Sequence, residues 1–175
     1  MLAQSAAVLD STAFDSAVRE GIQERVYPGA ALVVGTRDAI LFAKTYGRFT
    51  WSAASARPNV DSTFWDLASL TKVIATTPAL MLLVERGRVA LDAPVVRYVP
   101  EFNGAGTGVI TVRHLLTHTS GLRATLPLKD APDSATALHM VLTTVPIAPP
   151  GSQMVYSDLN AILLGEIVRR VSGLP

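Results

Sequence analysis

The sequence lacks cysteine, a charge excess of either sign, and any long hydrophobic run. With no cysteine in 175 residues, disulfides, cysteine-ligated zinc and thiol catalysis are excluded. The 15 basic and 14 acidic residues leave a net charge of +1 and do not cluster, which argues against nucleic acid as the main partner. The most apolar stretch, residues 75–84, holds two threonines and a proline, whereas a membrane span needs about 20 apolar residues. We therefore expect a buried core helix there and no membrane span.

The first ten residues have neither the basic segment nor the long apolar segment of a secretory signal. The default expectation is therefore a cytoplasmic protein, with a processed or truncated start as the alternative. Hydrophobic residues make up 49% of the chain and charged residues 17%, which excludes a disordered chain. A folded chain of this length can bury roughly 70% of the surface that the extended chain exposes, enough for a core.

The first third of the chain predicts one helix and one hairpin. Helical character covers residues 11–25, and two β-like runs follow at 30–35 and 40–46, joined by a turn. The polar residues 48–62 predict a loop. Two strands do not form an independently stable sheet. Either the hairpin packs on helices alone, or further strands come from elsewhere.

The rest of the chain is predicted to be helical. From Asp66 the apolar residues cover most of a helix circumference, so we expect a helix buried on nearly all sides. Gly87 suits its C-terminal cap, and Pro78 should bend it. The later helices are predicted by their caps and apolar spacing: one capped by Thr111 and ending near Gly121, one capped by Ser134, and one from Asp158 to Val171 with a Glu166–Arg170 pair opposite its apolar face.

Ser69 and Lys72 form a Ser-x-x-Lys motif at the start of the long helix. Residues three apart share a helical face, so the hydroxyl and the ammonium can lie within hydrogen-bond reach. A lysine that activates a serine needs a lowered pKa, which burial would provide. With 12 serines and 3 lysines, about 0.2 such motifs arise by chance, so the motif alone is weak. The structural alternative is a capped helix with a lysine whose amine reaches solvent.

Tyr156-Ser157-Asp158 precedes the last helix and is the second candidate. A tyrosine beside a cationic lysine could carry a proton to a leaving group, and Asp158 could hydrogen-bond the lysine or orient a substrate. The structural alternative is that Ser157 or Asp158 caps the helix and Tyr156 packs as a hydrophobic staple.

Four motifs in order resemble those of the serine β-lactamase-related hydrolases, the group of class C β-lactamases, penicillin-binding-protein-like peptidases and esterases. The resemblance covers about residues 28–175, and its motifs are Asp66-Leu67-Ala68-Ser69-Leu70-Thr71-Lys72, Leu83-Val84-Glu85-Arg86-Gly87, His114-Leu115-Leu116-Thr117-His118-Thr119-Ser120-Gly121-Leu122, and Tyr156-Ser157-Asp158-Leu159-Asn160 continuing into Leu164-Gly165-Glu166.

The resemblance implies a role for each matching residue. Ser69 matches the acylated nucleophile, Lys72 its partner base, and Tyr156 the tyrosine that relays the leaving-group proton. Asp158 is a substrate-binding candidate, although many members have asparagine there, which weakens the expectation of a β-lactamase-like amide contact. The Ser69 N–H should supply half of an oxyanion hole. The other half comes, in the family, from a strand after a third motif, and no such strand is found in this sequence.

The implied fold is α/β of the α+β kind: a β-lactamase/penicillin-binding-protein-like fold with an antiparallel sheet and a helical subdomain, here without its C-terminal strands. Family members are considerably longer. We therefore expect residues 1–175 to form a single, truncated domain, with the helix and first strands in 1–65 and the helical part with both motifs in 66–175.

The expected function is that of a serine hydrolase working through an acyl-enzyme on ester, β-lactam or D-amino-acid peptide carbonyls, with an esterase favoured and no cofactor needed. The alternative is a catalytically incomplete fragment or a non-catalytic binding module of the same fold, because loss of one oxyanion donor costs about 10²–10³ in rate. An unpaired sheet edge would favour self-association.

Three other motifs are weaker. His114 and His118 are spaced i,i+4, but no carboxylate ligand lies nearby in the sequence, so structural histidines are favoured over a metal site. The glycine-rich residues 103–108 lack the Lys-Ser/Thr of a phosphate-binding loop. Ser120 does not lie in a Gly-x-Ser-x-Gly elbow.

Overall fold

The computed structural model describes residues 10–174 and divides the chain into two units, Met1–Asp66 and Leu67–Pro175. The expectation about a secretory signal concerns residues 1–10, nearly all of which lie outside the described residues. That both units belong to one truncated domain stays a prediction.

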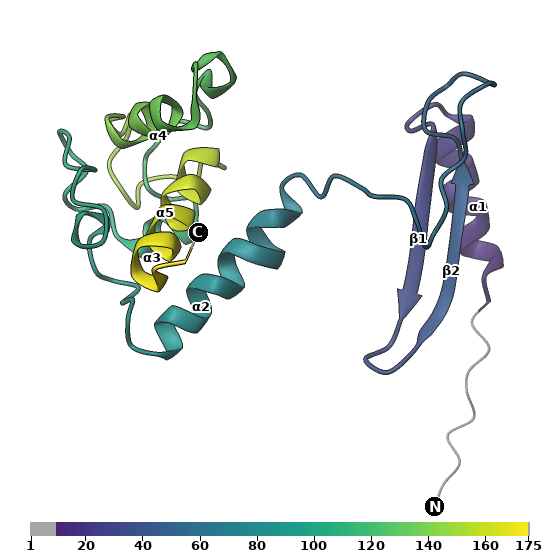
Figure 1. Cartoon of the computed structure of the whole chain (residues 1–175), viewed down its shortest axis with the longest axis horizontal. Coiled ribbons are helices and arrows are strands. Elements are labelled where there is room, and N and C mark those ends of the chain that lie inside the picture. Colours follow the sequence, from purple (N-terminus) through teal and green to yellow (C-terminus); the bar gives the residue numbers. More distant parts are fainter. Residues whose placement is uncertain (1–9, 175) are drawn as a thin grey trace, which may run out of the picture. The chain divides into compact units, whose positions relative to one another are not determined.

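The first unit is a helix and a hairpin, as predicted. Helix α1 spans Thr12–Gln23, and strands β1 (Gly29–Gly35) and β2 (Ile40–Gly47) pair antiparallel with Gly29 opposite Gly47. Figure 1 shows α1 lying alongside the two strands. The pairing register shifts between Val34 and Gly35, just before the turn of the hairpin. Within the described residues, the sheet has only these two strands.

The long helix of the second unit begins irregularly. A π-helical turn, Lys72–Thr76, precedes α2, Thr77–Glu85. Pro78 lies in the first turn of α2, where its missing N–H is tolerated. The irregularity in this helix is a widened turn that begins at Lys72, the last residue of the Ser-x-x-Lys motif, and ends just before Pro78. The bend expected at Pro78 stays a prediction. Gly87 follows the C-cap with a φ of +66°, the left-handed conformation expected of a helix-ending glycine.

The expectation that this helix is buried on nearly all sides is wrong. Leu80 and Leu83 are buried in the core, but Val73 and Met81 are 61% and 64% exposed. Helix α2 packs against α5 (Asp158–Ser172) on one face only. Apolar periodicity shows that a helix surface is hydrophobic, but it does not show whether another element of the chain covers that surface.

The second unit also contains shorter helical segments. They are the 3₁₀ turns Val95–Arg97 and Leu128–Asp130 and the helices α3, Val112–Leu116, and α4, Ser134–Leu142. The two predicted helices, α3 and α4, differ from the predictions at their ends.

Thr111 caps α3 as predicted, in a capping box with His114, but α3 ends at Leu116 rather than near Gly121. Helix α4 is capped by Asp133, whose side chain accepts a 2.7 Å hydrogen bond from the Thr136 N–H. The expected cap, Ser134, is instead the first helical residue. Both residues are good caps, and the sequence alone does not choose between neighbours.

Helix α5 lies at the centre of the second unit and contacts α2, α3 and α4. Its Leu159, Leu163 and Ile167 are completely buried in a core that also includes Phe102, Ile110 and Leu115. Within residues 10–174, no helix has the length and hydrophobicity that crossing a membrane requires. The core fixes the position of α5, and the residues just before α5 carry the second candidate motif.

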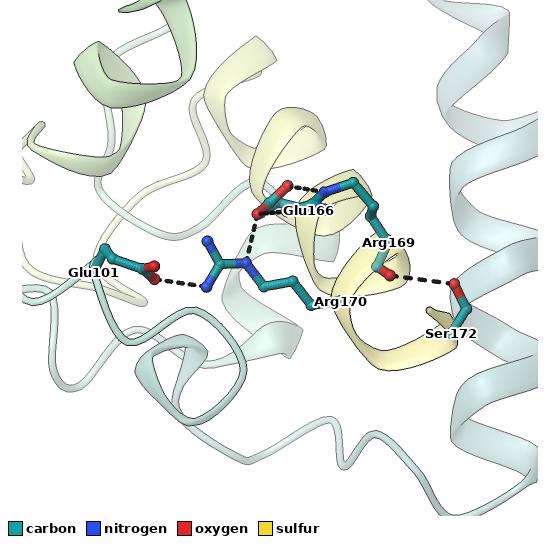
Figure 2. Close-up of polar contacts among 5 residues, drawn as sticks. All are labelled: Glu101, Glu166, Arg169, Arg170 and Ser172. Carbon is teal, nitrogen blue, oxygen red and sulfur yellow. Dashed lines mark hydrogen bonds and ion pairs between the residues drawn. The ribbon is translucent and has the colours of Figure 1, made fainter. Parts of the chain in front are cut away.

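The predicted Glu166–Arg170 pair is present, but Glu166 is not on an exposed face. Its side chain is only 6% exposed, and it accepts hydrogen bonds from both Arg169 and Arg170 (Figure 2). Arg170 also pairs with Glu101 at 2.6 Å, which ties α5 to the loop before α3. The two guanidinium groups, that of Arg169 first, lower the pKa of Glu166 to about 2.

Candidate active site

Ser69 lies at the entrance to the long helix, directly after a residue in an unusual conformation. Ala68 has a φ of +43°, in the left-handed region that non-glycine residues rarely adopt. Such conformations persist where surrounding structure holds them and are concentrated at functional sites. The π-helical turn that begins at Lys72 is a second irregularity of a kind common at such sites. The segment therefore departs from a regular helix on both sides of Ser69.

The predicted contact between Ser69 and Lys72 is present. The Lys72 ammonium donates a hydrogen bond to Ser69 Oγ at 3.0 Å. Lys72 Nζ also forms an ion pair with Asp158 Oδ1 at 2.8 Å. The spacing of the Ser-x-x-Lys motif brings the first pair together within one helical segment, whereas the second pair joins residues 86 positions apart only through the packing of α5.

The expectation that Lys72 has a lowered pKa is wrong. The hydrogen bond to the Asp158 carboxylate raises the pKa of Lys72, and this effect outweighs the burial that would lower it. The sequence argument considered only apolar neighbours and did not include an acidic partner. Lys72 is therefore a cation at neutral pH.

Tyr156 lies beside this cation. Lys72 Nζ is 5.1 Å from the centre of the Tyr156 ring. Interactions with the Ser69 hydroxyl, and then with the Lys72 ammonium, lower the pKa of the Tyr156 phenol from its ordinary value. The residue is half exposed, so the phenol is accessible from solvent. The geometry thus favours proton acceptance by Tyr156 more than by Lys72.

The segment that carries Tyr156 is held by backbone hydrogen bonds to the loop after α3. The Val155 N–H donates to the His118 carbonyl and the Asp158 N–H to the Ala124 carbonyl, each at 2.8 Å. Ser157 is completely buried and stands at the N-cap position of α5. Its hydroxyl does not cap the helix, however, because it donates to the Arg123 carbonyl at 2.8 Å. The expectation of a serine cap is therefore only partly met.

The two histidines hold local structure in different ways. His114 Nδ1 accepts a hydrogen bond from the Thr111 N–H in the capping box of α3. His118 Nδ1 accepts one from the Ser157 N–H at 3.1 Å, and the His118 ring packs on the ring of Tyr156 with centroids 4.6 Å apart. No group of histidines and carboxylates suited to a metal ion occurs among residues 10–174.

Ser120 and Asn160 were not recognised as site residues from the sequence. Both are buried, and Ser120 Oγ donates to Asn160 Oδ1 at 2.6 Å. Asn160 Nδ2 in turn lies 3.1 Å from His118 Nδ1. The available signal was that each is a polar residue within one of the four family-like motifs, next to apolar residues. Ser120 and Asn160 are 40 positions apart, so their pairing depends on the tertiary fold.

Two cavities adjoin Lys72 within the second unit. One, of about 280 Å³, is lined by Ser69, Lys72, His118 and Tyr156 among others. The other, of about 880 Å³, is lined mainly by the residues Thr125–Lys129, together with Lys72, Asp158 and neighbours on α5. The larger cavity has mostly apolar walls, including Leu126, Leu128 and Ile162.

A serine that follows a residue of strained backbone, a paired lysine and a tyrosine of lowered pKa are the groups that a serine acyl hydrolase uses. The sequence model of the family described as "Beta-lactamase" matches residues 14–175. The chain therefore belongs to the Beta-lactamase family of serine hydrolases, and the resemblance drawn from its motifs is confirmed.

Individual relatives agree with this assignment. The chain is 35% identical to "Esterase EstB" of Burkholderia gladioli, over 98% of this chain and 50% of that protein. Among solved structures, it matches an octameric penicillin-binding protein homologue from Pyrococcus abyssi with 28% identity and a TM-score of 0.75, over 95% of this chain and 40% of the other. A class C β-lactamase structure matches with 26% identity and a TM-score of 0.77, over 98% of this chain and 47% of the other.

These matches confirm the predicted β-lactamase/penicillin-binding-protein-like fold. The chain spans about half the length of the relatives it matches. Its similarity reaches three named classes of protein, an esterase, a penicillin-binding protein homologue and a β-lactamase, so the family assignment does not select one substrate.

Proposed function

We propose that this chain carries the nucleophile half of a serine hydrolase that works through an acyl-enzyme. The observation that carries the proposal is the convergence of Ser69 and Tyr156 on the Lys72 ammonium, which donates to Ser69 Oγ at 3.0 Å and lies 5.1 Å from the Tyr156 ring centre. Ser69 is the nucleophile in this proposal, Lys72 and Tyr156 manage its proton, and Asp158 holds Lys72 and faces the substrate.

The first proton transfer runs from Ser69 Oγ to the Tyr156 phenolate. A phenolate is a suitable base when a fixed cation stabilises it, and Lys72 is that cation because Asp158 keeps it charged. Ser69 Oγ then forms a bond to the substrate carbonyl carbon, and the carbonyl electrons move to its oxygen. Tyr156 returns the proton to the departing alcohol or amine as that bond breaks. Water then hydrolyses the acyl-enzyme by the reverse proton route.

The developing oxyanion needs two donors, as hydrolases of this chemistry provide. The Ser69 N–H at the start of the helical segment is the proposed first donor. The resemblance places the second on a strand that follows the last helix, and within residues 10–174 no strand follows α5. The alternative function, a non-catalytic binding module of the same fold, therefore deserves a direct test on this chain.

The favoured substrate is an ester with an apolar acyl group. The apolar walls of the 880 Å³ cavity beside Lys72 support this choice, since an apolar acyl chain would remove those walls from water. The similarity to an esterase over nearly the whole chain supports it as well. β-Lactams and D-amino-acid peptides are the other carbonyl substrates that the family resemblance includes.

Covalent labelling tests the proposal. We would incubate the chain with a fluorophosphonate probe and measure the adduct by intact-mass spectrometry, with Ser69→Ala as the test variant and the exposed Ser152→Ala as the matched control. The proposal expects an adduct on the native chain and on Ser152→Ala, and none on Ser69→Ala. No adduct on the native chain, or an equal adduct on Ser69→Ala, would favour the binding module. Hydrolysis of a short-chain ester and of a chromogenic cephalosporin would then separate an esterase from a β-lactamase.

We further propose that the chain self-associates through the hairpin. Neither β1 nor β2 pairs with a third strand among the described residues, and Ile40 and Leu41 are 71% and 50% exposed. Unpaired apolar edges promote strand-to-strand pairing. Light scattering after size exclusion should show oligomers that Leu41→Lys reduces and Val109→Lys, an exposed apolar residue outside the sheet, leaves in place. A monomeric native chain would refute this.

A further inference from the structure

His118 lies at the end of a network of polar groups that the proposed chemistry does not use. It follows α3 with a φ of +56°, a conformation that few non-glycine residues adopt. Its Nδ1 atom lies 3.1 Å from the Ser157 backbone nitrogen and 3.1 Å from Asn160 Nδ2. The ring of His118 also contacts the ring of Tyr156, with centroids 4.6 Å apart and an angle of 41° between the planes. The His118 imidazole therefore contacts the Tyr156 ring, the Ser157 backbone N–H and the Asn160 amide.

The hydrogen-bond partners determine where the proton of His118 lies. The Ser157 N–H can only donate, so His118 Nδ1 must accept and carry no proton. The neutral imidazole then has its proton on Nε2.

Asn160 is oriented consistently with this assignment. Ser120 Oγ donates to Asn160 Oδ1 at 2.6 Å and accepts from the Leu122 N–H at 3.2 Å, so the amide oxygen of Asn160 faces Ser120. The amide nitrogen of Asn160 therefore faces His118 Nδ1 as a second donor. All of these groups lie in the second unit, and Ser120, Ser157 and Asn160 are essentially inaccessible to solvent.

We propose that His118 is a positioning residue for Tyr156. Its neutral imidazole accepts hydrogen bonds from the Ser157 N–H and the Asn160 amide and so holds the segment next to Tyr156, and its ring packs against the phenol ring. This inference rests on the proposed role of Tyr156 in proton transfer. Tyr156 is half exposed, and its hydroxyl interacts with the Ser69 hydroxyl and the Lys72 ammonium. Its ring face contacts the His118 ring, and the backbone on either side of it is held by hydrogen bonds to His118.

Protonation of His118 would remove this support. A proton on Nδ1 would face the Ser157 N–H and the Asn160 amide, two donors that then have no acceptor. The charged and titratable groups that face His118 are Lys72 from the π-helical turn, Tyr156 from the segment before α5, and Asp158, the first residue of α5. Burial and then the Lys72 charge lower the pKa of His118, against the opposing effect of Asp158. The neutral form is thus favoured at neutral pH.

The first test is the tautomer in the native chain. The sequence has only three histidines, so long-range ¹H–¹⁵N spectra of ¹⁵N-labelled protein resolve each ring, and the exposed His139→Asn variant assigns one of them. We expect His118 to be neutral at pH 7 with the proton on Nε2. A proton on Nδ1, or a charged ring at pH 7, would overturn the inference. This measurement requires no enzymatic activity.

The second test separates the acceptor from the ring. His118→Asn keeps an acceptor oxygen near the place of Nδ1 and tolerates the left-handed backbone, but its side chain does not titrate. His118→Phe keeps a ring face for Tyr156 but leaves two buried donors unpaired, which should slow fluorophosphonate labelling of Ser69 by about ten- to a hundredfold. His118→Asn should label within about tenfold of the native rate. It should keep the acidic limb set by Tyr156 but lack the additional loss of rate that His118 protonation causes at acidic pH. His139→Asn should retain the native profile.

Each outcome has a defined meaning. Labelling of His118→Phe at the native rate would overturn the inference, as would a His118→Asn variant that loses rate at acidic pH as steeply as the native chain. If the native chain itself does not label, the proposed function fails for this chain. The ultraviolet titration of the Tyr156 phenol, taken as the difference from Tyr156→Phe, then still decides the positioning role. That titration should shift in His118→Phe and not in His139→Asn, and an unchanged titration in His118→Phe would overturn the inference.

Discussion

The Nζ atom of Lys72 lies 2.8 Å from Oδ1 of Asp158, and this ion pair joins the Ser-x-x-Lys motif to the first residue of α5. The carboxylate raises the pKa of Lys72 and keeps the ammonium charged. The charged ammonium in turn helps to lower the pKa of Tyr156. Asp158, which the family resemblance suggested as a substrate contact, therefore also affects the pKa values of Lys72 and Tyr156.

Replacement of Asp158 by Asn should shift the whole pH profile of Ser69 labelling to lower pH. Without the carboxylate, the pKa of Lys72 falls, so the cation is lost at lower pH and the alkaline limb moves down. Asp158 also raises the pKa of Tyr156, so its removal moves the acidic limb down as well. Rate constants for fluorophosphonate labelling from pH 5 to 11 would measure both limbs. A profile that stays in place would contradict the proposed control by Asp158.

Replacement of Tyr156 by Phe should slow labelling of Ser69 by about 10²–10⁴-fold, the usual contribution of a positioned proton-transfer group. Tyr27→Phe is the matched control, because Tyr27 lies in the other unit and donates to the Val18 carbonyl. Intact-mass kinetics at pH 8 would give both rates. If Tyr156→Phe labelled as fast as Tyr27→Phe, Lys72 would have to be the base despite its raised pKa.

The buried carboxylate of Glu166 should make the chain acid-sensitive. A pKa of about 2 in the folded state, below the ordinary 4.5, corresponds to stabilisation of about 3 kcal/mol at neutral pH. Because the folded pKa is the lower one, this stabilisation is complete above pH 4.5 and is lost as the pH falls toward 2.

Glu166→Gln should therefore lower the free energy of unfolding by up to about 3 kcal/mol at pH 7 and have little effect near pH 2. Urea unfolding followed by far-ultraviolet circular dichroism measures this difference. Glu101→Gln is the control: its carboxylate is exposed and, among the described residues, pairs with Arg170, so its effect should be much smaller than that of Glu166→Gln. An equal effect of both variants would mean that burial of Glu166 contributes nothing.

The cap of α4 offers a local comparison. Asp133→Ala should destabilise the second unit by about 1 kcal/mol, because the Thr136 N–H loses its acceptor. Ser134→Ala should be close to neutral, since Ser134 is the first helical residue and alanine has the higher helix propensity. Thermal unfolding of the two variants tests this. The opposite order would mean that Ser134 is the cap, as its sequence pattern suggested.

Much of the local structure could be predicted because it depends on neighbouring residues. The hairpin at 29–47, the Thr111 cap and the limits of α5 follow from alternation, capping residues and apolar spacing. The contact of Ser69 with Lys72 is of the same kind, because three positions along a helical segment bring the two side chains together.

The exposed face of α2 could not be predicted in the same way. Val73 and Met81 have the periodicity of core residues, yet they are more than half exposed. Whether an apolar face is covered depends on which other segments reach it, and that information is not contained in the helix itself.

The sequence by itself determined the family and located the two candidate motifs, those of Ser69 and Tyr156, because short-range spacing and motif order are properties of the chain. Only the tertiary structure decided the charge states and supports of the site. Lys72 meets Asp158, and His118 meets Ser157 and Asn160, across separations of 39 residues or more. Electrostatic and hydrogen-bond energies depend on distance in space and on exclusion of water, and for pairs so far apart in the chain the packing of α5 sets both.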